Sequence, residues 1–356
     1  MNKNITLNSE LNFQEYQEHK TILESCPQYL IVELTRSCNL KCPMCRDSNK
    51  EFVGHKMSME IFNKIDFELF DKAKMIDLRG WGESLILDNI IEIIERVAKK
   101  GALIRFVTNL SYRRKDVFEV LAKYNCKIDI SLDSVDETIL NQIRGGANLK
   151  IITENLKLLS SLYTQYHGNA DNINLLTTVQ YPALNTLYQL IPFAAEYSIK
   201  EIRLFPVAIN PESILSLENK DDEVNAMLQK VSSLSKEYNI NVIAGSKMGC
   251  LPSNPLNIPS CIHPWAYCYI AYNGKVGFCD HLIGPAFDDV LIGDLQINSF
   301  SEIWNSIEWQ DLRRNHLSER NKSIHNFEHC SWCYENKYID FEDMFDKSLS
   351  TSKVIL

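Results

Sequence analysis

The chain is 356 residues long, 45% hydrophobic and 23% charged, values that are ordinary for a globular protein large enough for more than one domain. Its formal charge of −9 argues against a nucleic-acid partner, because phosphate binding requires clustered lysine and arginine. No run of about eighteen apolar residues and no signal peptide is present, so we expect a cytoplasmic protein that does not cross a membrane. In that compartment, cysteines are more often metal ligands or free thiols than disulfides.

From Tyr29 onward, short apolar runs alternate with segments of helical periodicity. The expected strands are residues 29–35, 75–80, 103–108, 127–132, 172–180 and 201–206, with one more around 239–244. The expected helices are residues 59–73, 88–100, 115–124, 149–164, 186–198, 221–238 and 300–314. Repeated strand–helix alternation predicts parallel strands joined by right-handed crossovers. Six units are fewer than the eight of a closed TIM barrel, so the expected fold is α/β, an open partial (β/α)6 barrel.

Differences in composition and periodicity divide the chain into three segments. Residues 1–28 are polar and form a lead-in, and residues 29–240 form the barrel. After Gly245, prolines interrupt the periodicity and cysteines become dense. We therefore assign residues 241–356 to a small C-terminal α+β domain with a tail.

Three cysteines follow the first expected strand at the spacing C-x3-C-x2-C: Cys38, Cys42 and Cys45. Three thiolates on one loop can hold three irons of a [4Fe–4S] cluster and leave the fourth iron open to a ligand that is not protein. The alternatives are buried thiols or three of four zinc ligands. For zinc, His55 is the only nearby candidate for the fourth ligand.

This loop resembles the cluster loop of the radical S-adenosylmethionine (radical SAM) enzymes. The resemblance implies that the amino and carboxylate groups of SAM bind the open iron. An electron from the cluster then cleaves SAM to methionine and a 5′-deoxyadenosyl radical, which abstracts hydrogen from a substrate. It also implies a partial barrel and an electron donor such as flavodoxin or ferredoxin.

The second expected strand ends in Gly80-Trp81-Gly82-Glu83. Glycines allow backbone to approach a ligand closely, and the carboxylate can accept hydrogen bonds from an ammonium group. The sequence is similar to the Gly-Gly-Glu-Pro motif that holds the SAM amino group in this family, although Trp81 and Ser84 depart from it. Without that resemblance, an ordinary turn between a strand and a helix would explain it.

Later strand ends supply further candidate SAM contacts, since catalytic groups of barrels gather at the carboxyl ends of strands. The hydroxyl of Ser131 and the carboxylate of Asp133 suit ribose hydroxyls, although Asp133 could instead cap the next helix. Arg144, in a sequence similar to the family's Ile-Arg-Gly, suits the SAM carboxylate. The full set of these later candidates is Thr108, Asn109, Ser131, Asp133, Arg144 and Arg203, of which Arg203 could equally lie on the surface.

A second cysteine set lies in the C-terminal segment. Asn273-Gly274 predicts a tight hairpin between Cys261 and Cys279. With Cys330 and Cys333, these cysteines make a complete ligand set for one cluster or one zinc ion. The spacing resembles SPASM and Twitch domains, which implies one auxiliary [4Fe–4S] cluster.

The remaining cysteines have no single expected role. Cys268 is an alternative ligand in the C-terminal set, and Cys250 or Cys268 could serve as a hydrogen donor to a substrate radical. Cys126 lies beside an apolar strand and is expected in the core.

Taken together, these features predict a radical SAM enzyme of oxidoreductase or epimerase type in natural-product biosynthesis. Only 28 residues precede the first strand, whereas many peptide-modifying members begin with a leader-binding domain. This difference favours a small polar metabolite (a sugar, aminocyclitol or nucleoside, dehydrogenated or epimerised) over the alternative, a ribosomally made peptide. A more distant alternative is a non-catalytic iron–sulfur electron carrier or sensor.

Overall fold

A computed structural model describes residues 2–45, 54–244, 261–317, 330 and 354–356. Seven parallel strands run in chain order across one sheet. They are β1 (Tyr29–Val32), β2 (Met75–Asp77), β3 (Leu103–Thr108), β4 (Lys127–Ser131), β5 (Ile173–Val179), β6 (Glu201–Pro206) and β7 (Asn241–Ala244). The strands do not close into a ring, so the prediction of an open partial barrel is confirmed.

Both ends of the parallel sheet are extended by other strands. Strand β8 (Tyr267–Ile270) pairs with β1 in parallel and then with β9 (Lys275–Gly277) in an antiparallel hairpin, followed by β10 (Gly293–Asp294). At the other end, β11 (Val354–Ile355) pairs with β7. The first C-terminal strands therefore continue the sheet of the barrel, which the sequence did not predict.

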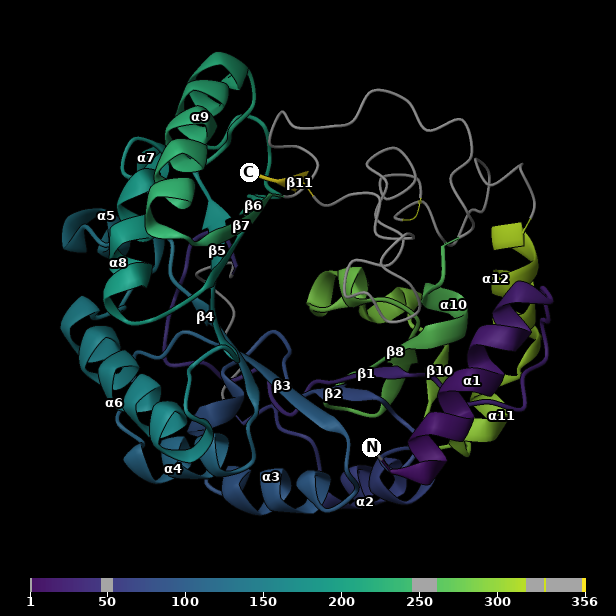
Figure 1. The fold of residues 1–356 in the computed structure, drawn as a ribbon. Helices are drawn as coiled ribbons and strands as arrows, with labels where there is room; N and C mark the ends of the chain where they lie inside the picture. Colours follow the sequence, from purple (N-terminus) through teal and green to yellow (C-terminus); the bar gives the residue numbers. More distant parts are fainter. Residues whose placement is uncertain (1, 46–53, 245–260, 318–329, 331–353) are drawn as a thin grey trace.

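Helices cover the outer side of the curved sheet (Figure 1). Alternate strand residues such as Ile104 and Phe106 are buried in the same core as the apolar face of α3, which includes Ile90 and Ile94. The helices of the barrel are α2 (Met59–Glu68), α3 (Ile90–Ala98), α4 (Lys115–Lys123), α5 (Glu137–Ile143), α6 (Leu149–His167), α7 (Tyr181–Leu184), α8 (Leu190–Glu196) and α9 (Asp221–Tyr238).

The N-terminal helix α1 (Lys3–Gln17) packs beside the C-terminal helices α10 (His263–Ala266), α11 (Phe300–Trp304) and α12 (Ile307–Leu317) (Figure 1). Asn12 Nδ2 donates to the Trp265 carbonyl at 2.8 Å, and Trp304 Nε1 donates to the Ser25 carbonyl at 2.9 Å. The lead-in therefore belongs to the same packed body as the C-terminal segment.

The single helix expected over residues 300–314 is two helices. The chain breaks at Asn305, whose side-chain amide bonds both backbone groups of Leu23 at 2.9 and 2.8 Å. Ser306 Oγ then accepts from Trp309 N near the start of α12. The break therefore results from a tertiary contact with the N-terminal segment.

A polar network occupies the inner face of the sheet, opposite the helices. Asp77 is in register with Arg105, and Asp129 is in register with the residue two positions after Arg105. Alternate strand residues point to the same side, so the three side chains share this face. Arg105 Nε donates to Asp129 at 2.7 Å, and its Nη1 donates to the Tyr29 hydroxyl at 2.6 Å. That hydroxyl in turn donates to Asp77 at 2.6 Å. The network ties β1, β2, β3 and β4 together.

We expect Arg105→Ala to destabilise the protein by about 3–5 kcal/mol, because it leaves the buried carboxylates of Asp77 and Asp129 without their shared cation. The matched control is Arg113→Ala, since Arg113 is 68% exposed and its ion pair with Glu154 should contribute less than about 1 kcal/mol. Urea unfolding of the two variants measures the difference. Equal midpoints would contradict the importance assigned to the network.

Candidate functional site

The cluster loop follows β1 at the carboxyl end of the parallel strands. Cys42 is buried, whereas Cys38 and Cys45 are half-buried. The backbone N–H of Leu40 points at Cys38 Sγ at 3.4 Å, and Cys45 N donates to the Cys42 carbonyl at 3.1 Å. The loop therefore presents all three cysteines within one short turn, with a backbone donor already directed at one sulfur.

The segment Arg144-Gly145-Gly146 packs directly against this loop. Lys41 N donates to the Gly145 carbonyl at 2.9 Å, and a Cβ on Gly145 would lie 2.7 Å from the Lys41 carbonyl oxygen. Only glycine fits so close an approach. The sequence motif after α5 is thus a packing surface for the cluster loop.

The second rim loop is held just as closely. Gly82 N donates to the Thr35 carbonyl at 3.1 Å, and Glu83 N donates to the Ser37 carbonyl at 2.9 Å. A Cβ on Gly82 would lie 2.4 Å from the Ser37 carbonyl oxygen, so this position also requires glycine. The structure therefore brings the Gly80–Glu83 motif against the start of the cysteine loop.

Glu83 is 2% exposed, and its carboxylate accepts from Asn109 N at 2.8 Å and from Leu85 N at 3.3 Å. Burial raises the pKa of Glu83 to about 7, although the two backbone donors oppose the shift. The carboxyl is thus poised to ionise near neutrality and to accept from a cationic group.

Asn109 connects the third rim loop to the cysteines. Its side-chain amide donates to Asn39 Oδ1 at 3.0 Å and lies 3.8 Å from Cys38 Sγ. The neighbouring Thr108 hydroxyl lies 3.1 Å from the Tyr112 hydroxyl. Two residues predicted as SAM contacts therefore stand beside the cluster loop and Glu83.

Asp133 and Arg144 form a bidentate ion pair, which the sequence did not predict. Arg144 Nε and Nη2 donate to the Asp133 carboxylate at 2.7 and 2.9 Å, and the backbone N–H of Thr178 and the amide of Gln180 complete its shell. Burial alone would lower the pKa of Arg144, but the Asp133 carboxylate outweighs it and raises the pKa. The ion pair therefore stands directly before Gly145, which packs on the cysteine loop.

The other two strand-end candidates are Ser131 and Arg203. Ser131 is half-buried at the end of β4. Arg203 is 6% exposed, not at the surface, and its Nε donates to Glu201 at 2.8 Å on β6. The roles of these residues as SAM contacts stay predictions.

In the C-terminal segment, the predicted hairpin forms between β8 and β9, with Gly274 at φ +86° in the turn. Cys261 and Cys279 are buried, and Cys330 is half-buried with a pKa raised to about 12 by burial. Cys333 lies outside the described residues, as does Cys250. The four-thiolate set thus remains a prediction, with three of its members placed.

Cys268 is set apart from the other C-terminal cysteines. It lies within β8 with no exposed surface, between Tyr267 and Tyr269. Successive strand residues face opposite sides. Tyr267 stacks on Tyr29 and contacts the ring of His263, which lies beside Cys279. The structure therefore places Cys268 on the opposite face from Cys279, against its use as an alternative ligand there or as a hydrogen donor inside the barrel.

An ion-pair cluster joins the C-terminal segment to the cysteine loop. Arg36, two residues before Cys38, donates through both terminal nitrogens to Asp288 at 2.7 and 2.6 Å and through Nε to Glu33 at 3.0 Å. Asp288 lies in the turn η4 (Pro285–Val290) after Cys279. Glu33 also accepts from Trp81 N at 2.8 Å. The pairing of Arg36 with Asp288 has no local sequence signal, because the two residues lie far apart in the chain.

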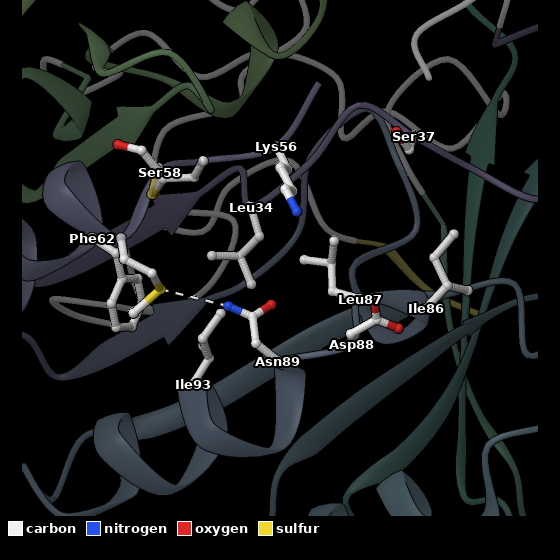
Figure 2. Close-up of a pocket in the computed structure, with 12 residues that line it drawn as sticks. Leu34, Ser37, Lys56, Ser58, Phe62, Ile86, Leu87, Asp88, Asn89 and Ile93 are labelled. Atoms are coloured by element: carbon white, nitrogen blue, oxygen red, sulfur yellow. Dashed lines mark hydrogen bonds between the residues drawn. The ribbon is translucent and has the colours of Figure 1, made fainter. Parts of the chain in front are cut away.

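A pocket of about 470 Å³ borders the outer side of the site, between the first residues of the loop and the segments before α2 and α3 (Figure 2). None of the described candidate cysteines and SAM contacts is among its lining residues. Its lining residues are Leu34, Ser37, Lys56, Met57, Ser58, Met59, Phe62, Ile86, Leu87, Asp88, Asn89 and Ile93.

Comparison with known families places both cysteine sets in recognised domains. The family model for the radical SAM superfamily matches residues 32–191, and that for an iron–sulfur cluster-binding domain, SPASM, matches residues 261–334. Among the described residues, no helix is long and apolar enough to span a bilayer.

Among curated proteins, the chain is 36% identical over 138 residues to the subtilosin (antilisterial bacteriocin) biosynthesis protein AlbA of Bacillus subtilis, covering 38% of this chain and 31% of AlbA. The chain thus spans about a third of the length of AlbA and of the next relative, a cofactor-modifying protein of Pyrococcus furiosus. It is also similar to the AdoMet-dependent heme synthase of Methanosarcina barkeri, with 22% identity covering 80% of this chain and 84% of that protein.

Two solved structures share the fold. Streptococcus suis SuiB bound to S-adenosylmethionine matches with a TM-score of 0.65 and 16% identity over 84% of this chain and 70% of SuiB. The protein anSMEcpe with bound AdoMet matches with a TM-score of 0.62 and 16% identity over 86% of this chain and 84% of that one. At this identity the likeness concerns the fold.

We expect Asp288→Asn to loosen the loop locally, because the buried Arg36 loses its charged bidentate acceptor. Amide hydrogen exchange should accelerate around residues 33–38 and 285–291 while β3 and β4 stay protected. The control is Asp289→Asn, since Asp289 is exposed beside it and the change should leave exchange unaltered. Identical exchange in both variants would refute the clamp.

Proposed function

Because the chain belongs to the radical SAM superfamily and carries a SPASM domain, we propose that Cys38, Cys42 and Cys45 hold the cluster that binds SAM. The enzyme's cofactors are SAM and two [4Fe–4S] clusters. The donor set fits a cluster ligated by thiolates: three cysteines lie on one short loop, a backbone N–H is directed at Cys38, and Gly145 packs against the loop at Lys41. This arrangement carries the proposal.

When bound, the first cluster supplies the electron that cleaves SAM reductively to methionine and a 5′-deoxyadenosyl radical. Glu83 would accept from the SAM ammonium group, since its carboxylate lies buried at the rim beside the loop. Ser131 offers its hydroxyl to ribose from the end of β4. Cys261, Cys279, Cys330 and Cys333 would hold the auxiliary cluster.

For the substrate we infer a peptide. The supporting observation is the similarity to AlbA, a protein of bacteriocin biosynthesis, which at 36% has the highest identity of the three curated relatives named above. The small polar metabolite expected from the sequence is the second candidate. The similarity to the heme synthase over most of both chains supports a substrate that is not a peptide, without favouring the sugar, aminocyclitol or nucleoside class. The proposed reaction with either is hydrogen abstraction, followed by oxidation or epimerisation.

The two substrate classes can be separated directly. Short peptides encoded beside this gene, and a panel of sugars, aminocyclitols and nucleosides, are each incubated with reduced enzyme and SAM. A peptide that stimulates 5′-deoxyadenosine formation and passes deuterium into it supports the proposal. Deuterium transfer from a member of the small-molecule panel alone would replace it with the second candidate.

Anaerobically reconstituted protein should contain about eight irons per chain. Changing Cys38, Cys42 and Cys45 together to alanine should leave about four, because the C-terminal ligands are separate from the loop. Iron and zinc analysis checks both values. Loss of all iron in the triple variant, or stoichiometric zinc in the native protein, would overturn the assignment.

SAM affinity should depend on the ionisation of Glu83. Since its pKa is about 7, most of the carboxyl is protonated at pH 6 and ionised at pH 7.5, and the ionised form accepts from the ammonium group. Affinity should therefore rise roughly fivefold to tenfold between these pH values.

Glu83→Gln should weaken SAM binding by about 1.5–3 kcal/mol at pH 7.5 and abolish this rise, with iron content unchanged. Calorimetric titration with SAM measures both effects. The control, Glu92→Gln, changes an acid whose side chain is 63% exposed on α3 and should behave as wild type. A pH dependence that survives in Glu83→Gln would assign Glu83 a purely structural role.

A further inference from the structure

His263 lies against Cys279 in the C-terminal segment. His263 Nδ1 is 3.0 Å from Cys279 Sγ, and both residues are 6% exposed. Together with Asp280 they form a group whose potential ligand atoms all lie within 4.8 Å of one another. The imidazole therefore belongs to the immediate surroundings of a proposed auxiliary-cluster ligand.

The orientation of the imidazole is fixed by packing. Its ring lies 4.0 Å, centroid to centroid, from Tyr267, which stacks on Tyr29 at 4.8 Å. The Tyr29 hydroxyl is held in turn by Asp77 and Arg105, each at 2.6 Å. The polar network of the barrel therefore holds Tyr29 in place, Tyr29 packs on Tyr267, and Tyr267 fixes the ring whose Nδ1 contacts the sulfur.

The short distance argues for a hydrogen bond and against His263 as a second cluster ligand. Each iron of a [4Fe–4S] cube takes one protein ligand, so two ligands must reach to different irons. Atoms only 3.0 Å apart cannot do so. When Cys279 is a thiolate it has no proton to give, so Nδ1 must carry the proton and donate it.

Other polar groups also meet this sulfur. The backbone N–H of His281 points at it at 3.5 Å, and an oxygen of the Asp280 carboxylate lies 3.4 Å away. Asp280 is paired with Arg79 at 3.2 Å, which offsets its charge. Of these three contacts to the Cys279 sulfur, the one from His263 Nδ1 is the shortest.

We propose that His263 donates a hydrogen bond from Nδ1 to the Cys279 thiolate and thereby raises the reduction potential of the auxiliary cluster. The proposal rests on the function proposed above, in which Cys279 is a ligand of that cluster. A donor to a cluster sulfur draws negative charge from the cluster, and this stabilises the reduced state, which carries one more electron.

The test is a redox titration of both clusters, followed by electron paramagnetic resonance, in His263→Phe and His263→Asn. Phenylalanine keeps a ring against Tyr267 but removes the donor, whereas the asparagine amide nitrogen can take the place of Nδ1. We expect eight irons in both variants. The auxiliary potential should fall by up to about 59 mV in His263→Phe, a tenfold change for one electron, and recover largely in His263→Asn.

The cluster at Cys38, Cys42 and Cys45 serves as the internal reference and should keep its potential. His167→Phe is the matched control, because His167 bonds the Ala122 carbonyl at 2.6 Å on the far wall of the barrel. An unchanged auxiliary potential in His263→Phe would overturn the proposal. Loss of about four irons from that variant alone would also overturn it, because His263 would then be part of the ligand set.

A measurement on native protein covers the case in which the variants do not fold. With histidine labelled by ¹⁵N, pulsed spectroscopy of the reduced auxiliary cluster should detect a weak coupling to one ring nitrogen, as a hydrogen bond gives. No coupling, or the strong coupling of a direct ligand, would refute the proposal. If native protein instead holds only about four irons, the auxiliary-cluster assignment itself fails, and the iron count distinguishes that outcome.

Discussion

The buried carboxylate of Glu33 is the contact on which the arrangement of the site depends. It has no exposed surface, and its oxygens accept from Arg36 Nε at 3.0 Å, from Trp81 N at 2.8 Å and from Tyr272 N at 3.4 Å. These donors come from the cysteine loop, the glycine-rich rim loop and the C-terminal hairpin. A buried carboxylate must be fully satisfied, so the three segments are fixed relative to one another.

The rim loops reach the cysteine loop through backbone, and for this reason glycine is required there. A Cβ at Gly80 would lie 2.3 Å from Glu33 Cγ, and those at Gly82 and Gly145 would meet backbone carbonyls of the cysteine loop. Such contacts bring the backbone of the rim loops directly against the backbone of the cysteine loop. The geometry of the site is therefore set mainly by backbone packing, with Asn109 as a side chain that reaches Cys38.

The two halves of the chain share one sheet and one polar interior. Strand β8 pairs with β1, and Tyr267 on β8 stacks on Tyr29 on β1, which is hydrogen-bonded to Asp77 and Arg105. Arg79 then bridges Asp77 at 3.0 Å and Asp280 at 3.2 Å, beside Cys279. The surroundings of the proposed auxiliary ligand are thus continuous with the inner face of the barrel.

The sequence by itself determined the parallel strands, the open barrel, the two cysteine sets and the hairpin at Gly274, because periodicity, cysteine spacing and turn chemistry are local signals. Only the tertiary structure decided that Asp133 pairs with Arg144, that Asn305 breaks the expected helix, and that Arg36 meets Asp288. It also placed Cys268 on the outer face and His263 against Cys279. These outcomes join residues far apart in the chain, or depend on which face of a strand is turned inward, and neither is encoded within a short stretch of sequence.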